Sequence, residues 1–180
     1  MPQYSWTKGG PAARMAKKDR WYILRVRFGS EEVVTSGLRR LGIDVFLPSK
    51  SSPISHAPEE RASCSHVFAR FSLANQRDVL LVPGVLGLIG VPKPIPVPDR
   101  DVANLKAAMD AGMTMKILPM VHDPVRGRIS KGPLSGHDGD FIECRGKWNL
   151  VVRIEGLECT LAFPLPHSSL DVSPKHTNRT

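Results

Sequence analysis

Cysteine is scarce in this chain of 180 residues. The three cysteines, Cys64, Cys144 and Cys159, form no Cys-x-x-Cys pair and suggest no disulfide framework, so we expect a reducing, cytoplasmic setting. Zinc is not expected, because Cys64-Ser65-His66 has no second Cys/His pair to complete four ligands. A cysteine–histidine nucleophile stays open as an alternative, since such partners meet only in the fold. A strand-edge cysteine without a role is favoured.

Long apolar runs are also missing. The N-terminus has no apolar segment typical of a signal peptide. The longest uncharged run lies between Asp78 and Lys93, contains three glycines, and is shorter than the roughly 20 residues that a membrane-spanning helix needs. A hydrophobic fraction of 41% is nevertheless sufficient for a packed core. We therefore expect a soluble protein with no membrane partner.

Acidic residues are fewer than basic ones, and the net charge is +8. Residues 1–20 have five basic side chains and one acidic one, and residues 171–180 have two and one. The body between them therefore carries only +3. Two alternatives stay open for the basic N-terminal tail: non-specific contact with DNA or RNA, or a solubilising role alone.

The pattern along residues 20–112 predicts an α+β domain with the element order β-α-β-β-α-β-α. The predicted strands cover residues 21–28, 43–48, 66–71 and 85–89, and the predicted helices run from Ser30 to Gly42, from Asn75 to Leu81, and from Asp99 to Gly112. The first strand should bury Leu24, Val26 and Phe28. The first helix should bury Val34, Leu38 and Leu41, which recur at i, i+4 and i+7.

The rest of the chain divides by composition. Residues 1–19 and 174–180 are predicted to be disordered tails, and residues 49–63 a long exposed loop or a frayed hairpin. The hydrophobic pattern lapses over residues 113–124, which we predict to be a linker. Short strands then predict a second domain over residues 125–173.

A glycine-rich segment opens this second domain. It reads Lys131-Gly132-Pro133-Leu134-Ser135-Gly136-His137-Asp138-Gly139, and taken alone it is also compatible with an ordinary hairpin loop. Its pattern, Gly-Pro-Leu-x-Gly-x-x-Gly, resembles the KOW motif of the NusG family and of some ribosomal proteins. The matching residues are Gly132, Pro133, Leu134, Gly136 and Gly139. The resemblance implies a small barrel that binds proteins or RNA and does no covalent chemistry.

The residues around this motif suit such a barrel. The side chains predicted to fill it are Ile129, Leu134, Phe141, Val151, Ile154, Leu161 and Phe163. Gly127, Gly132 and Gly139 are predicted to occupy turns. Strand-favouring residues, together with Pro164 and Pro166, predict that these residues do not refold into the helical hairpin known in some relatives.

A second, independent resemblance lies upstream. The matching residues, in order, are Trp21-Tyr22, Glu31, Gly42-Ile43, Phe46-Leu47-Pro48, Val67-Phe68 and Pro83-Gly84-Val85. Ahead of the KOW motif, this series resembles the NGN domain of NusG-family transcription elongation and antitermination factors. The resemblance covers about residues 20–173. It implies an α+β fold, in which an NGN-type antiparallel sheet with packed helices is followed by a small SH3-like KOW β-barrel.

The resemblance also implies a mechanism. The NGN domain would dock on the clamp helices of the largest RNA polymerase subunit and reach toward the second-largest subunit. The KOW domain, on a flexible tether, would recruit a ribosomal protein or a termination factor. By position, the polymerase-binding residues would be Arg25, Ser63, Cys64, His66, Phe68 and Leu88. The tip that faces the second-largest subunit would consist of Asn75, Gln76 and Arg77.

One departure from the family pattern stands out. The chain reads Ser63-Cys64-Ser65-His66 where family members usually read Phe-Pro-Gly-Tyr, so an aromatic interface anchor is missing. This departure favours a specialised, RfaH-like paralogue over the general factor.

We expect neither enzymatic activity nor a cofactor. Gly132-x-x-x-Gly136 lacks the ending of a phosphate-binding loop, and His137 to Asp140 is predicted to be a solvated turn rather than a cation site. The alternative function is an RNA-binding or ribosome-associated KOW module. Only Trp148, next to Lys147, suggests base stacking, and a ribosomal KOW protein would be far more basic.

Overall fold

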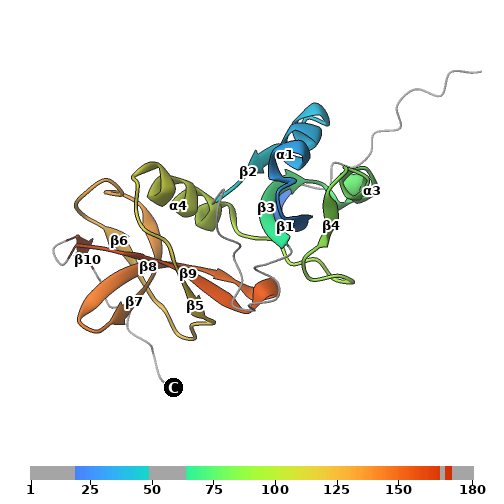
Figure 1. Cartoon of the computed structure of the whole chain (residues 1–180). Coiled ribbons are helices and arrows are strands. Elements are labelled where there is room, and N and C mark those ends of the chain that lie inside the picture. Colours follow the sequence, from blue (N-terminus) through green and yellow to red (C-terminus); the bar gives the residue numbers. More distant parts are fainter. Residues whose placement is uncertain (1–18, 49–63, 167–168, 172–180) are drawn as a thin grey trace, which may run out of the picture.

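The computed structural model of the chain describes residues 19–48, 64–166 and 169–171. The tails predicted over residues 1–19 and 174–180, except for Asp19, lie outside the described residues, as does the loop predicted over residues 49–63. Two antiparallel sheets stand at opposite ends of the molecule, and helix α4 (Asp99–Asp110) lies between them (Figure 1). The predicted α+β fold followed by a second, all-β unit is confirmed.

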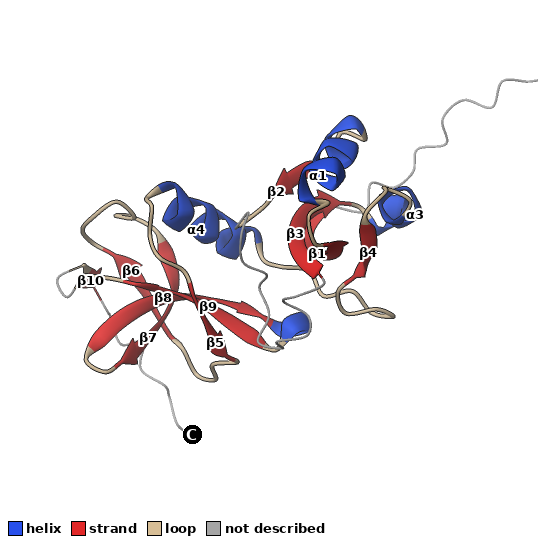
Figure 2. Ribbon diagram, viewed as in Figure 1, coloured by secondary structure: helices blue, strands red, loops and turns tan. Residues whose placement is uncertain are grey.

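The first sheet consists of β1 (Arg20–Arg27), β2 (Asp44–Phe46), β3 (Cys64–Phe71) and β4 (Val85–Leu88), in the order β2-β3-β1-β4. All of its strand pairs are antiparallel. Helices α1 (Glu31–Arg40) and α3 (Gln76–Leu80) pack on one face, where Val34, Leu38 and Val79 join the core (Figure 2). The predicted element order is confirmed.

Two apolar residues predicted to be buried are exposed. Leu41 is 49% exposed because α1 ends at Arg40, after which the Leu41 N–H turns back to the carbonyl of Leu38 and leaves the helical period. Phe28 is 52% exposed because β1 ends at Arg27 and the chain turns at Gly29, whose φ is 81°. In both cases the apolar pattern of the sequence continues one position beyond the end of the element.

The second sheet consists of β5 (Lys116–Pro119), β6 (Val125–Ile129), β7 (Asp138–Cys144), β8 (Lys147–Ile154), β9 (Cys159–Pro164) and β10 (Leu170–Asp171), in the order β10-β6-β7-β8-β9-β5. We call these six strands the barrel domain. All seven side chains predicted to fill it are buried. Strand β5 lies inside the segment predicted as a linker and pairs with β9, so part of that segment belongs to the sheet.

The glycines of the barrel domain serve two purposes. Gly132 and Gly136 have φ values of 91° and 87°; Gly132 occupies the tight turn predicted for it, and Gly136 lies in the same turn segment. The prediction of turns at Gly127 and Gly139 is wrong, because these residues face each other across the β6–β7 pair. A β-carbon at Gly139 would lie 2.5 Å from the side chain of Leu150 on β8 and 3.2 Å from the side-chain nitrogen of Asn104 on α4. Gly139 therefore permits close packing against β8 and α4 and does not form a turn.

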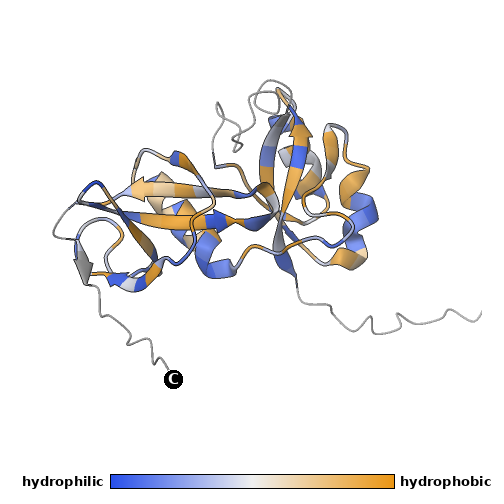
Figure 3. Cartoon of the chain, turned by 90° about the horizontal axis from the view of Figure 1, so that it is seen from below, coloured by the Kyte–Doolittle hydropathy of each residue, from blue (hydrophilic) through white to orange (hydrophobic). Residues whose placement is uncertain are grey.

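One hydrophobic core joins the two sheets. It contains Trp21, Ile23 and Phe68 of the first sheet, Leu105 of α4, and interior residues of the barrel domain such as Phe141. Helix α4 contacts β1 on one side and β7 and β8 on the other. Hydrophobic residues run along the strands of both sheets in Figure 3. The described parts of the chain include no helix that is long and apolar enough to cross a membrane.

Candidate functional site

The two faces of the first sheet separate the residues predicted to bind polymerase. Leu88 pairs with Leu24 and belongs to the core under α1 and α3. Phe68 pairs with Ile23 and belongs to the core shared with α4 and the barrel domain. Because side chains alternate between the faces of a strand, neighbouring partners Ile23 and Leu24 point in opposite directions. The structure therefore does not bring Phe68 and Leu88 together on one surface.

The residues predicted to bind polymerase also differ in their exposure to solvent. Phe68 is fully buried, and His66 and Leu88 are 2% and 6% exposed. Ser63 and the side chain of Cys64 lie outside the described residues. Among the predicted patch side chains that the structure describes, Arg25 alone is exposed, directly opposite His66 on β3 and Gly87 on β4.

Ser65, at the rim of the predicted patch, has a structural role. It is buried and its hydroxyl donates to the Glu31 carboxylate over 2.7 Å, which ties β3 to the first turn of α1. Burial alone would raise the pKa of Glu31, but hydrogen bonds from Ser65 and from the backbone outweigh it and hold the pKa below its ordinary value. The carboxylate also complements the dipole of α1 at its N-terminal end.

The predicted tip residues lie together on the surface. Asn75 ends a short 3-10 turn, and Gln76 and Arg77 begin α3. Beside them, Leu80 and Leu81 are 36% and 71% exposed, and a shallow groove of about 460 Å³ lies between them and the 3-10 turn. This end of the first sheet thus presents basic and apolar groups side by side.

The KOW-motif residues fold back onto the barrel domain. Leu134 is buried in its core, while the N–H of Gly136 donates to the carbonyl of Ile129 over 2.7 Å. Trp148, the stacking candidate, is half-buried and packs against the same core. A ring that is half-buried in this way offers only part of its surface to a base, so the support for base stacking is weak.

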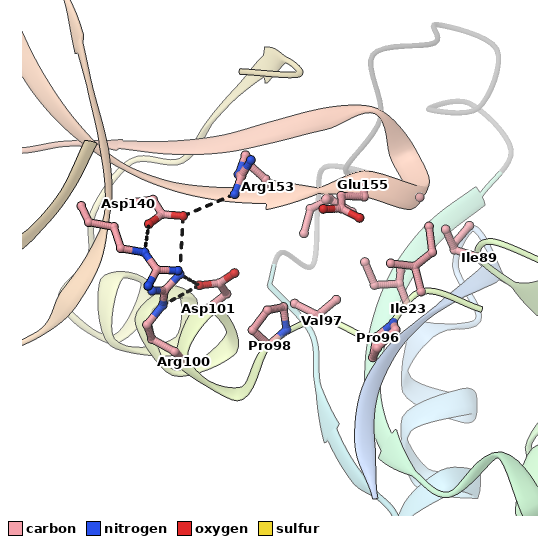
Figure 4. Close-up of a pocket in the computed structure, with 14 residues that line it drawn as sticks. Ile23, Ile89, Pro96, Val97, Pro98, Arg100, Asp101, Asp140, Arg153 and Glu155 are labelled. Carbon is pink, nitrogen blue, oxygen red and sulfur yellow. Dashed lines mark hydrogen bonds and ion pairs between the residues drawn. The ribbon is translucent and has the colours of Figure 1, made fainter. Parts of the chain in front are cut away.

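A polar cluster joins α4 to the barrel domain (Figure 4). The Asp140 side chain is 8% exposed and lies 3.4–3.6 Å from the guanidinium groups of Arg100, Arg126 and Arg153. Arg100 also lies 3.0 Å from Asp101. Burial raises the pKa of Asp101, and the neighbouring Arg100 only partly offsets this effect. The predicted solvated turn at His137 to Asp140 is therefore wrong, because Asp138 and Asp140 lie in β7 and bind arginines.

Two glycines permit close contacts of the barrel domain, one with α4 and one with the segment after β4. Asn104 on α4 is 3% exposed and donates to the carbonyl of Asp138 over 2.9 Å, beside Gly139. A β-carbon at Gly156, between β8 and β9, would collide with the side chain of Ile89, which follows β4. These contacts are not predictable from the sequence pattern, because nothing local indicates which residues meet across 34 or more positions.

The described residues include no group of three or more histidine, cysteine, aspartate and glutamate side chains that could hold a metal ion. Cys144 is exposed and Cys159 is buried, and both are free thiols. Burial raises the pKa of Cys159 to about 11.

We expect iodoacetamide to modify Cys144 and to leave Cys159 unmodified in the native protein at neutral pH. The thiolate is the reactive form, and Cys159 has neither exposure nor a thiolate there. Peptide mass spectrometry of native and urea-unfolded protein measures both sites, and the unfolded sample serves as the control. Rapid native modification of Cys159 would contradict the packing of β9.

Parts of this chain are similar to a known protein family and to solved structures. Residues 19–106 match the family model described as "Transcription termination factor nusG". The solved structure "Domain interaction in Thermotoga maritima NusG" is 22% identical, covers 86% of this chain and 97% of that chain, and has a TM-score of 0.42. A structure of the MjSpt4:Spt5 complex is 17% identical, covers 88% of this chain and 99% of that chain, and has a TM-score of 0.30. Comparison with curated proteins gives no match.

Proposed function

We propose that this chain, whose residues 19–106 match the NusG family model, acts as a transcription elongation or antitermination factor that binds RNA polymerase. The family match over the first sheet and its helices is the observation that carries this proposal. In the proposed mechanism, the first domain contacts the clamp of the largest polymerase subunit. The barrel domain contacts a further protein, a ribosomal protein or a termination factor. No catalytic step is involved.

We propose the exposed part of the first sheet around Arg25 as the clamp-facing surface. Arg25 is exposed there, and a β-carbon at the neighbouring Gly87 would have open space around it. A charged substitution of Phe68 cannot test this contact. The introduced charge would be buried in the core without a partner and would disturb the fold itself. The surface around Asn75, Gln76 and Arg77 is the proposed contact with the second-largest subunit.

We expect Arg25→Glu to weaken binding of the full chain to core RNA polymerase and to an isolated clamp-helix fragment by about tenfold or more. The substitution replaces a positive charge at the proposed interface by a negative one. Polymerase groups that attract Arg25 would therefore repel the glutamate. A pull-down followed by titration with labelled protein measures the affinity.

Arg40→Glu is the matched control, because Arg40 is exposed on α1, on the other side of the first sheet. It should bind as the unmodified chain does. Equal binding by both variants would remove the Arg25 surface from the proposal, and absence of binding by the unmodified chain would refute polymerase binding itself.

A specialised, RfaH-like role and a cytoplasmic location remain predictions. Residues 1–18, proposed to contact DNA or RNA non-specifically, lie outside the described residues.

A further inference from the structure

A cavity of about 170 Å³ lies where the first sheet, the N-terminal end of α4 and the barrel domain meet (Figure 4). Its size exceeds the engineered cavity of about 150 Å³ that admits benzene, but stays below the roughly 300 Å³ at which pockets for drug-sized ligands begin. The cavity therefore suits a ligand of amino-acid size. Ile95 and Arg126 line it and are 40% and 70% exposed, so it is accessible from solvent.

The walls of the cavity differ in chemistry. Ile23, Ile89 and Val97 form an apolar wall on the side of the first sheet, as Figure 4 shows. The opposite wall consists of the polar cluster on α4 and the barrel domain. A ligand that fills this space needs an apolar part and a charged part at its two ends.

The polar wall has spare donors for an anion. Arg100, Arg126 and Arg153 face Asp101 and Asp140, and with Glu155 the charged side chains that line the cavity balance, as the two charges of a zwitterion do. Each guanidinium carries five N–H groups, and Arg126 and Arg153 each make only one of the ion pairs in this cluster. A ligand carboxylate would accept hydrogen bonds from these donors.

An exposed carboxylate lies next to these donors. Glu155 is exposed, lines the cavity, and stands between Arg153 and the apolar wall in Figure 4. Its carboxylate makes no hydrogen bond or ion pair with any residue that the structure describes. An ammonium group in the cavity would supply its partner.

We propose that this cavity binds a free aliphatic L-α-amino acid as its zwitterion. The ligand carboxylate binds the guanidinium groups of Arg126 and Arg153, its ammonium binds Glu155, and its side chain packs on Ile23 and Ile89. Because the walls come from both sheets, the bound amino acid stabilises the contact between them by mass action.

Titration of the full chain with L-leucine by isothermal calorimetry tests this proposal. We expect saturable binding with a dissociation constant of about 1 mM or tighter, a strength in keeping with a ligand of this size. N-acetyl-L-leucine lacks the ammonium, L-leucinamide lacks the carboxylate and glycine lacks the apolar side chain, so each should bind at least about tenfold more weakly. Glu155→Gln should weaken L-leucine binding to a similar extent.

Two tryptophan variants locate the site. Ile95→Trp fills the cavity from its rim and should abolish binding, whereas Val91→Trp, at a position 60% exposed in the same loop and away from the cavity lining, should not affect it. Thermal unfolding of both variants shows that they are folded. Absence of binding to the unmodified chain at about 10 mM L-leucine, or binding that survives Ile95→Trp, would overturn the proposal. Equal binding of N-acetyl-L-leucine would overturn the zwitterion assignment.

Discussion

Replacing Phe68 by alanine should lower the free energy of unfolding by about 3–5 kcal/mol. Phe68 is fully buried, and its ring centroid lies 6.0 Å from that of Phe46. It belongs to the core that joins the first sheet, α4 and the barrel domain. Removal of the ring leaves a cavity in this shared core, so both units should lose stability together. Urea unfolding followed by far-UV circular dichroism and by tryptophan fluorescence measures the loss, and the two midpoints should coincide.

Phe28→Ala is the matched control. Phe28 is 52% exposed in the turn after β1, and its replacement should change the free energy of unfolding by no more than about 0.5 kcal/mol. An equal effect of the two alanine variants would show that Phe68 is not part of the core. Two separate unfolding midpoints in the unmodified chain would show that the sheets unfold independently.

Replacing Gly156 by leucine should weaken the contact between the two sheets. The β-carbon of any residue at this position meets the side chain of Ile89, a β-branched residue that cannot rotate out of the way easily. The overlap should cost about 1–3 kcal/mol. We expect unfolding of this variant to split into two transitions, one for the first sheet with its helices and one for the barrel domain.

Gly87→Leu controls for the larger side chain itself. A β-carbon at Gly87 meets no atom within 4 Å, so this variant should keep the single transition of the unmodified chain. A single transition at an unchanged midpoint in Gly156→Leu would indicate that the contact between Gly156 and Ile89 does not hold the sheets together.

The elements of the fold were predictable because their signals are local. Glu31 in the first turn of α1, Arg40 in the last, and the spacing of Val34 and Leu38 together indicate the helix and its buried face. In the barrel domain, side chains such as Phe141 and Leu161 are apolar residues in strand-favouring runs, and both are buried. Such signals are contained within a few neighbouring residues.

The candidate site was less predictable, because positions carried over from a family pattern do not state which face of a strand each residue occupies. Phe68 and Leu88 were expected on one surface, yet their partners Ile23 and Leu24 are consecutive on β1 and point to opposite faces. The prediction of a turn at Gly139 failed for a related reason. The sequence alone does not distinguish a glycine in a strand from a glycine in a turn. The distinction depends on the side chains that pack around it, here Leu150 and Asn104.

The sequence by itself determined the order of helices and strands, the interior of the barrel domain and the family resemblance, because hydrogen bonding and hydrophobic periodicity act between near neighbours. Only the tertiary structure decided that Phe68 is buried, that three arginines surround Asp140, and that a cavity opens beside Glu155. Arg100 and Asp140 are 40 positions apart, and they meet only because α4 packs on β7 and β8. Which faces come together depends on the packing of the whole chain, and no local pattern encodes it.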